Sequence, residues 1–182
     1  MANILLAVSG SISAYKAADL TSQLRKRGHA VQVIMTKGAQ AFITPLTLQT
    51  LSKRPVLTDV MVEENPTEIA HIDTGKWADL FILAPASANS LAKLAHGFAD
   101  DMLSATALAL DPKTPKLIAP AMNTKMYQNP ATQANLATLE AYGYHQIFPK
   151  ESLLACGDYG PGALADLSVI LLEIEETLSN EN

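Results

Sequence analysis

The stretch Leu80–Ser90, LFILAPASANS, decides the fold. Five apolar residues without a charge stand before Pro85, and so short a run is typical of a strand buried on both faces rather than of a helix. Small and hydroxyl-bearing residues follow, and a helical pattern resumes at Leu91. In an open parallel sheet, ligands bind where the carboxyl ends of strands pass into the amino ends of helices, because free N–H groups and the helix dipole point there. The stretch therefore predicts a central strand that ends at a binding site.

A second stretch, LIAPAMNT at residues 117–124, repeats this design: an apolar run, then Ala-Pro-Ala, then Asn123. Two strands with the same ending predict two walls of one pocket. The amide of Asn123 has two interpretations. It can cap the turn that follows, or it can hold a substrate carboxylate without neutralising it.

The composition of the chain excludes several classes of protein. The chain has 182 residues, 48% of them apolar, and a net charge of −5, which predicts one globular domain over 1–182. It has no Lys/Arg block for nucleic acid and no apolar run near the roughly 20 residues that span a membrane. The start, MANILLAVSG, lacks the basic segment of a signal peptide. No His, Cys, Asp or Glu cluster has metal-ligand spacing, so no metal is expected. We expect a cytoplasmic protein that acts on a small molecule.

The rest of the chain alternates strands and helices. Residues 4–8 and 31–35 predict strands around a helix that Ser13 caps and that runs to about Arg27, a right-handed βαβ unit. Further helices are expected over 45–51, 99–110, 129–142 and 166–178, and further strands over 116–119 and 144–148. His71 falls in a polar loop. Four Gly or Pro residues over 153–164 predict a loop or flap. The fold class is α/β, a three-layer sandwich with a flavodoxin-like parallel sheet.

The first strand ends in a turn, Gly10-Ser11-Ile12-Ser13, that lacks the G-x-G-x-x-G dinucleotide fingerprint. Two hydroxyls at a helix start suit a single phosphate monoester, and Thr36 and Ser87 could complete the site. Ordinary helix capping explains any one of these residues equally well. Three hydroxyl-bearing turns on one sheet edge favour a mononucleotide, and flavin mononucleotide (FMN) fits a flavodoxin-like order.

Two single residues have both a plain and a functional interpretation. A lone histidine such as His71 is more often structural than catalytic. A lone cysteine such as Cys156 is most often a small buried apolar side chain. Cys156 nevertheless lies in a segment rich in Gly and Pro, where exposure and movement are expected, so its thiol could give a proton to a reactive intermediate.

Five motifs in order resemble the homo-oligomeric flavin-containing cysteine decarboxylase family over about the whole chain: GSISAYK at 10–16, His71, PASANS at 85–90, PAMNTKMY at 120–127 and ACGD at 155–158. The resemblance implies that His71 is the catalytic base and Cys156 the acid of a substrate-binding flap at about 153–166. It implies that Asn123 binds the substrate carboxylate, and that Leu153, Leu154 and Ala155 line the substrate. The residues that it implies for FMN are Gly10, Ser11, Ile12, Thr36, Ser87, Ala88, Asn89, Ser90 and Ala121.

The implied activity is FMN-dependent decarboxylation of N-[(R)-4′-phosphopantothenoyl]-L-cysteine to 4′-phosphopantetheine in coenzyme A biosynthesis. When CO2 leaves a simple cysteine amide, no group is present to delocalise the charge of the resulting carbanion. Oxidation of the thiol to a thioaldehyde solves this, because the C=S bond accepts the electrons, and the resulting enethiolate is then reduced. The resemblance also implies trimers that assemble into dodecamers, with FMN and substrate at subunit contacts.

The sequence departs from the family at three places. Ser90 stands where threonine is frequent, and Tyr127 where tryptophan is common. Ala163-Leu164-Ala165-Asp166 replaces Arg-Met-x-Glu, which removes an arginine that could latch the flap or hold the substrate phosphate.

Three relatives of the same fold are alternatives. A peptidyl-cysteine decarboxylase should not need the flap cysteine, so Cys156 counts against it. A flavin prenyltransferase lacks the pair of PAMN and ACGD motifs. A flavin-binding regulatory subunit that inhibits a phosphatase usually carries an acidic tail, for which the acids near this C-terminus are too few: Glu173, Glu175, Glu176 and Glu181.

Overall fold

The computed structural model describes residues 1–63, 67, 69–154 and 157–180. Its main sheet has five strands in the order β2-β1-β3-β4-β5, and all neighbours are parallel. This is the strand order of flavodoxin-like folds, so the predicted fold class is confirmed. The strands are β1 (Asn3–Val8), β2 (Ala30–Met35), β3 (Leu80–Ala86), β4 (Lys116–Pro120) and β5 (Tyr144–Gln146).

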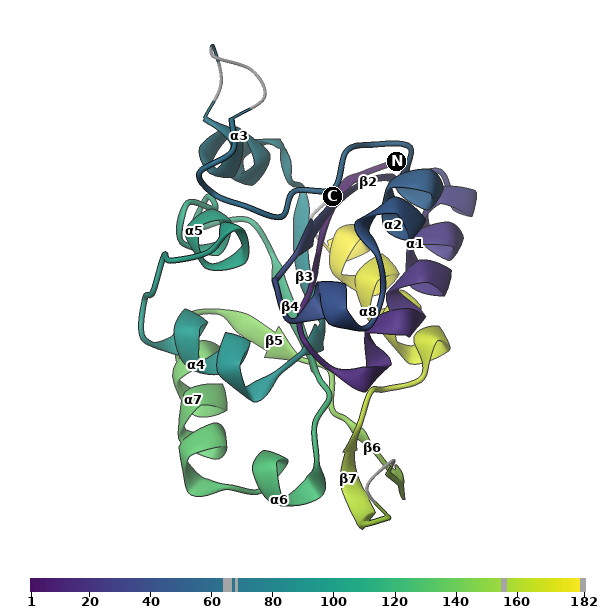
Figure 1. The fold of residues 1–182 in the computed structure, drawn as a ribbon, viewed down its shortest axis with the longest axis vertical. Helices are drawn as coiled ribbons and strands as arrows, with labels where there is room; N and C mark the ends of the chain where they lie inside the picture. The colour runs from purple at the N-terminus through teal and green to yellow at the C-terminus, as the bar shows by residue number, and fades with distance from the viewer. Residues whose placement is uncertain (64–66, 68, 155–156, 181–182) are drawn as a thin grey trace.

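Helices cover both faces of the sheet and make three layers (Figure 1). One face carries α1 (Lys16–Lys26), α2 (Pro45–Ser52) and α8 (Leu167–Asn180). The other carries α3 (Ala70–Trp77), α4 (Ala88–Ala95), α5 (Met102–Leu108) and α7 (Pro130–Ala141). Three short helices lie in connections: η1 (Ile12–Tyr15), η2 (Ala39–Ala41) and α6 (Thr124–Tyr127).

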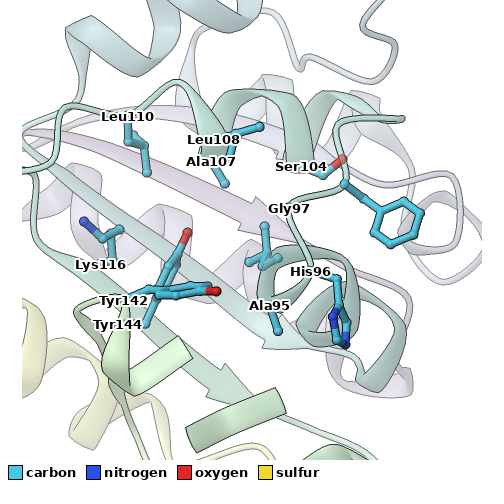
Figure 2. Close-up of a pocket in the computed structure, with 12 residues that line it drawn as sticks. Ala95, His96, Gly97, Ser104, Ala107, Leu108, Leu110, Lys116, Tyr142 and Tyr144 are labelled. Carbon is cyan, nitrogen blue, oxygen red and sulfur yellow. The ribbon is translucent and has the colours of Figure 1, made fainter. Parts of the chain in front are cut away.

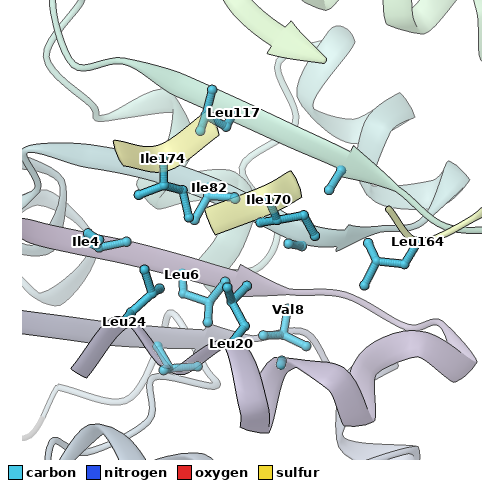
Figure 3. Close-up of a cluster of buried hydrophobic side chains, with 14 of the residues drawn as sticks. Ile4, Leu6, Val8, Leu20, Leu24, Ile82, Leu117, Leu164, Ile170 and Ile174 are labelled. Carbon is cyan, nitrogen blue, oxygen red and sulfur yellow. The ribbon is translucent and has the colours of Figure 1, made fainter. Parts of the chain in front are cut away.

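The core has two halves because successive side chains of a strand point to opposite faces. Ile4, Leu6 and Val8 of β1 lie in the cluster under α1 and α8, which Figure 3 shows. Leu5 and Ala7 lie in the cluster on the other face. All seven residues of β3 are buried, which confirms the prediction of a strand covered on both sides. Each fully buried Leu or Ile stabilises the fold by about 1.5–3 kcal/mol.

The segment expected as a loop contains a hairpin instead, β6 (Lys150–Leu153) paired antiparallel with β7 (Tyr159–Ala163). Gly160 and Gly162 allow β7 to lie directly on the turn after β4. A Cβ on Gly162 would come within 2.3 Å of the carbonyl oxygen of Met122, and one on Gly160 within 2.8 Å of Thr124. These glycines therefore serve a close approach between two segments rather than a turn.

Three local predictions are also corrected. Ser11, not Ser13, is the capping residue: its Oγ accepts a hydrogen bond from the N–H of Ser13 (3.3 Å) at the start of η1. His71 lies in α3 and not in a loop. The helix expected from residue 99 begins at Met102, because Asp101 forms a capping box with Ser104. Within the ranges given above, no helix is long and apolar enough to cross a membrane.

Candidate active site

A cavity of about 680 Å³ opens at the carboxyl edge of the sheet, a size usual for a small-molecule site. Its walls come from η1 and the turn before it, the start of α4, the turn after β4, and the β6–β7 hairpin. The two Ala-Pro-Ala stretches therefore border one pocket, as their shared pattern predicted. The sequence-predicted residues that line it are Gly10, Ser11, Ile12, Ser87, Ala88, Asn89, Ala121, Asn123, Leu153 and Leu154.

The turns after β1 and β3 are joined by a buried serine that sequence reasoning missed. Ser9 Oγ donates to the carbonyl of Pro85 (2.7 Å) and accepts from the N–H of Ser87 (2.7 Å). Ser87 in turn caps α4, since its Oγ accepts from the N–H of Ser90 (3.2 Å). The first N–H groups of a helix have no acceptor within it and carry partial positive charge. The start of α4 therefore presents an electropositive wall.

Two predicted cofactor residues, Ser90 and Thr36, are not among the residues that line the cavity. The hydroxyl of Ser90 is buried and lies 3.2 Å from the hydroxyl of Ser87. Thr36 Oγ1 accepts a hydrogen bond from the N–H of Ala39 (3.2 Å), the first residue of η2. The turn that carries Thr36 packs on the first turn so closely that a Cβ on Gly10 would lie 3.1 Å from the backbone of Gly38. Thr36 and Ser90 support the residues that line the cavity.

Asn123 lies at the N-cap of α6 and has both ends of its amide engaged. Its Oδ1 accepts from the N–H of Lys125 (2.8 Å), so the capping interpretation holds. Its Nδ2 donates to Oδ2 of Asp158 (2.8 Å), which lies on the hairpin. Asp158 was not among the predicted site residues, although the ACGD motif contains it.

The charged side chains among the described residues that line the cavity are two lysines, Lys16 and Lys150. Lys150 pairs with Asp166, and Lys16 is half-buried. The hydrogen bond and charge of Lys150, together with the charge of Lys16, hold the pKa of Asp166 below its ordinary value. The cavity is thus positive and suits an anion. Sequence reasoning missed both lysines, although Lys16 is part of the GSISAYK motif.

His71 is not brought to this cavity. Its helix, α3, lies at the end of the molecule opposite the β6–β7 hairpin (Figure 1). Its Nδ1 is buried and has no hydrogen-bond partner among the described residues. Cys156 and Ala155, the other predicted flap residues, lie outside the described residues. Within the described ranges, no group of three or more His, Cys, Asp or Glu side chains could hold a metal.

A second cavity, of about 560 Å³, lies between α4, α5 and the start of β5 (Figure 2). Its wall is mostly aliphatic and aromatic and contains none of the predicted site residues. Tyr144 packs edge-on against Phe81, with 6.3 Å between the ring centroids. Burial raises the pKa of the Tyr144 phenol to about 12.

Comparison with known proteins agrees with this architecture. A family model described as Flavoprotein matches residues 1–179. A probable phosphopantothenoylcysteine decarboxylase of Streptococcus mutans is 63% identical over 175 residues, which cover 96% of this chain and 98% of that protein. The coenzyme A biosynthesis bifunctional protein CoaBC of Bacillus subtilis is 49% identical over 98% of this chain, which spans 44% of that longer protein.

Solved structures match as well. A mutant PPC decarboxylase complexed with pantothenoylaminoethenethiol superimposes with a TM-score of 0.87 at 33% identity and 98% coverage of both chains. The FMN-dependent cysteine decarboxylase SpaF superimposes with a TM-score of 0.85 at 33% identity, also with 98% coverage of both. The chain therefore belongs to the flavoprotein family of homo-oligomeric flavin-containing cysteine decarboxylases that its motifs indicated.

Proposed function

We propose that this chain decarboxylates N-[(R)-4′-phosphopantothenoyl]-L-cysteine to 4′-phosphopantetheine, the phosphopantothenoylcysteine decarboxylase step of coenzyme A biosynthesis. The observation that carries the proposal is the 63% identity, over 96% of the chain, with the S. mutans protein named for this activity. The positive cavity with an amide in its wall supports the proposal, because this substrate has a phosphate at one end and a carboxylate near the other.

We propose FMN as the cofactor, held by the cavity-lining residues Gly10, Ser11, Ile12, Ser87, Ala88, Asn89 and Ala121, with Thr36 and Ser90 supporting these residues rather than contacting the cavity. The residues present fit this group. Ser11 and Ser87 put hydroxyls at two helix starts, where a phosphate binds well. Gly10 lines the cavity, and its lack of a Cβ lets this turn pack on Gly38. The chemistry that FMN supplies when bound is acceptance and return of a hydride, which makes the oxidised cysteine an electron sink for decarboxylation.

Asn123 orients the substrate carboxylate in this proposal. An amide N–H donates a hydrogen bond to a carboxylate without carrying a charge. A lysine in its place would stabilise the ground-state anion whose charge must leave the carboxylate, and so would raise the barrier. Leu153 and Leu154 flank this end of the cavity from the hairpin, where apolar side chains exclude water from the reacting carbon.

Lys150 and Lys16 bind the phosphate end of the substrate in this proposal. Lys150 is the strand partner of Ala163, the position at which the family pattern has an arginine. The positive charge of Lys150 on β6 therefore lies beside Ala163 on β7, where the arginine of the family pattern is missing. Asp166 forms an exposed ion pair with Lys150, a contact worth little that a phosphate can replace.

The proposed active site is completed by a second copy of the chain. His71 serves as the base that accepts the thiol proton, yet its helix lies at the far end of the protomer (Figure 1). The rim of the cavity exposes apolar side chains, with Ile12 59% and Leu153 70% exposed. Beside α3, Ile69 is 51% exposed. Contact between these two surfaces would bring His71 of one copy to the cavity of another, in the trimers and dodecamers that the family resemblance implies.

The direct test is release of CO2 from phosphopantothenoylcysteine by the purified yellow protein under anaerobic conditions, with bleaching and recovery of the flavin absorbance. Stoichiometric 4′-phosphopantetheine is the expected product. Turnover of peptides with a C-terminal cysteine, but not of this substrate, would replace the proposal with a peptidyl-cysteine decarboxylase. No turnover of either would favour a flavin-binding regulatory subunit.

Cys156→Ser separates the two halves of the reaction. Loss of the proposed proton donor should leave CO2 release intact and should make the oxidised enethiol accumulate, detected by mass spectrometry as a product two hydrogens lighter. One of the similar solved structures is a cysteine-to-serine mutant of a PPC decarboxylase complexed with pantothenoylaminoethenethiol. That ligand is an enethiol, so the complex supports this expectation. Normal 4′-phosphopantetheine made by the variant at the wild-type rate would exclude Cys156 as the acid.

A further inference from the structure

We propose that Ser9 is a positioning residue for the phosphate of the cofactor: it sets the spacing between the turn after β1 and the start of α4, so that the two walls hold one phosphate together. The inference rests on the proposed FMN site and deepens it. Ser9 is not among the residues that line the cavity, and its side chain is fully buried. It therefore acts through the two walls and not by contact with a ligand.

Ser9 joins the two chain segments beyond the end of their strand pairing. The parallel ladder between β1 and β3 reaches the pair Ala7 and Leu83. Past this pair, the N–H and the hydroxyl of Ser9 both donate to the carbonyl of Pro85, at 3.2 and 2.7 Å. The same hydroxyl oxygen accepts from the N–H of Ser87 at 2.7 Å. One residue therefore contributes three hydrogen bonds between the two segments.

Both segments enter the cavity wall at once after these bonds. Gly10 and Ser11 line the cavity directly after Ser9, and Ser87 and Ala88 line it on the other segment. A phosphate has several acceptor oxygens, so it can bind the hydroxyl of the first wall and the N–H groups at the start of α4 together. A group that bridges two walls depends on the spacing between them. The phosphate is thus the part of FMN that is most sensitive to Ser9.

Loss of the Ser9 hydroxyl breaks two of the three hydrogen bonds. The N–H of Ser87 then has lost its acceptor, and a part-buried N–H moves toward another partner. The capping bond from the N–H of Ser90 to Ser87 Oγ lies within the start of α4 and moves with it. The change therefore alters the spacing of the two walls rather than the helix itself.

The test compares two flavins that differ only in the phosphate, which FMN carries and riboflavin lacks. Their dissociation constants are measured by flavin fluorescence, with the full-length chain stripped of its flavin. Ser9→Ala should weaken FMN binding about tenfold and riboflavin binding by no more than about twofold, because only FMN bridges the two walls. The preference of the chain for FMN over riboflavin should fall accordingly.

Two further variants control this comparison. Ser9→Cys is close to serine in size, but sulfur is a weak donor and acceptor, so it should also lower the preference for FMN; it replaces Ser9→Ala if that variant does not fold. Thr21→Val removes another fully buried hydroxyl, which donates to the carbonyl of Ala17 (2.7 Å) within α1, outside the cavity wall. Thr21→Val should lower the melting temperature and keep the wild-type preference for FMN.

Equal weakening of both flavins by the Ser9 variants would mean that Ser9 only stabilises the fold, and would overturn the inference. Unchanged binding of both flavins would overturn it too. A wild-type chain that binds FMN and riboflavin equally well would exclude a phosphate held between the two walls. Failure of the proposed cofactor has a different signature, because the wild type would bind neither flavin. Failure of the proposed decarboxylation alone would leave both dissociation constants as expected.

Discussion

Two cavities of similar size lie at opposite ends of one helix. The first residues of α4, Ala88 and Asn89, line the cavity of about 680 Å³, and its last residues, Leu94 and Ala95, line the cavity of about 560 Å³. The first cavity thus meets a helix amino end, which carries partial positive charge. The second meets the carboxyl ends of α4 and α5, which carry partial negative charge. A phosphorylated ligand suits the first and is disfavoured by the second.

The side chains repeat this difference. Among its apolar side chains the first cavity has serine hydroxyls, two amides and two lysines, whereas the second has two tyrosines, one histidine, one serine and one lysine among aliphatic side chains (Figure 2). Volume alone would rank the two as nearly equal. The direction of the helices and the chemistry of the turns indicate that the first cavity is the binding site. Both features follow from the order of strands and helices along the chain.

His71→Asn is the change from which we expect the largest effect. Because His71 lines neither cavity of its own copy, it tests whether the first cavity is complete in one protomer. Loss of the proposed general base should lower kcat by about 10²- to 10⁴-fold while the protein keeps the yellow colour of the proposed flavin. His96→Asn, in the wall of the second cavity, should leave kcat unchanged. Steady-state CO2 release and the flavin spectrum measure both outcomes.

Mixed oligomers extend this test. When His71→Asn and Asn123→Ala chains are co-expressed, some cavities combine an intact Asn123 with an intact His71 from a neighbour, and part of the activity should return. No recovery in verified mixed oligomers would place His71 and Asn123 of the same copy in one active site. A colourless His71→Asn protein would identify a structural histidine instead.

Lys150→Ala addresses the charge difference between the cavities. The variant should raise KM for the phosphorylated substrate about tenfold, because the proposed charged hydrogen bond to phosphate would be lost. KM for the dephosphorylated substrate and the FMN content should not change, which separates substrate phosphate from cofactor phosphate. Lys116→Ala, in the second cavity, is the matched control and should behave as wild type. An equal rise in KM for both substrates would contradict the assignment.

The sequence predicted the first cavity well because its walls follow strong local patterns. The apolar runs before Pro85 and Pro120 are too short for helices and free of charge, so strands β3 and β4 could be recognised. Small and hydroxyl-bearing residues after such strands mark helix starts, which located Ser87 and Asn123. These features depend on residues that are close together in the chain, so they can be recognised from the sequence without the three-dimensional structure.

Features that depend on distant contacts were not predictable. Helix α3 has the sequence AHIDTGKW, with glycine and polar residues where a helix pattern would need apolar ones. Gly75 is there because a Cβ would come within 3.1 Å of the carbonyl of Ala109. The β7 sequence YGPGA is typical of a turn, and only its contact with Met122 and Thr124 explains it as a strand. Asp158 was not predicted as a site residue for the same reason, since its hydrogen-bond partner Asn123 is 35 residues away in the chain.

Tyr144→Phe should have the smallest effect, confined to alkaline pH. Burial raises the pKa of Tyr144 to about 12 in the folded chain, against 10.0 ordinarily. Below pH 10 the phenol is neutral in both states. Between pH 10 and 12 the unfolded chain loses the proton first, so the free energy of unfolding falls by about 1.4 kcal/mol per pH unit from this group.

Phenylalanine keeps the edge-on packing against Phe81 and cannot ionise, so the variant should lose stability less steeply over this range in urea titrations. Tyr142→Phe is the control for removal of a tyrosine hydroxyl from an exposed position, because Tyr142 is 59% exposed. Identical slopes for wild type and Tyr144→Phe would mean that the wall of the second cavity is open to water when the chain is folded. A steeper loss of unfolding free energy with pH in the wild type would mean that the Tyr144 wall of the second cavity is packed and shielded from water. The hydroxyl-lined wall at the other end of α4 differs in this respect.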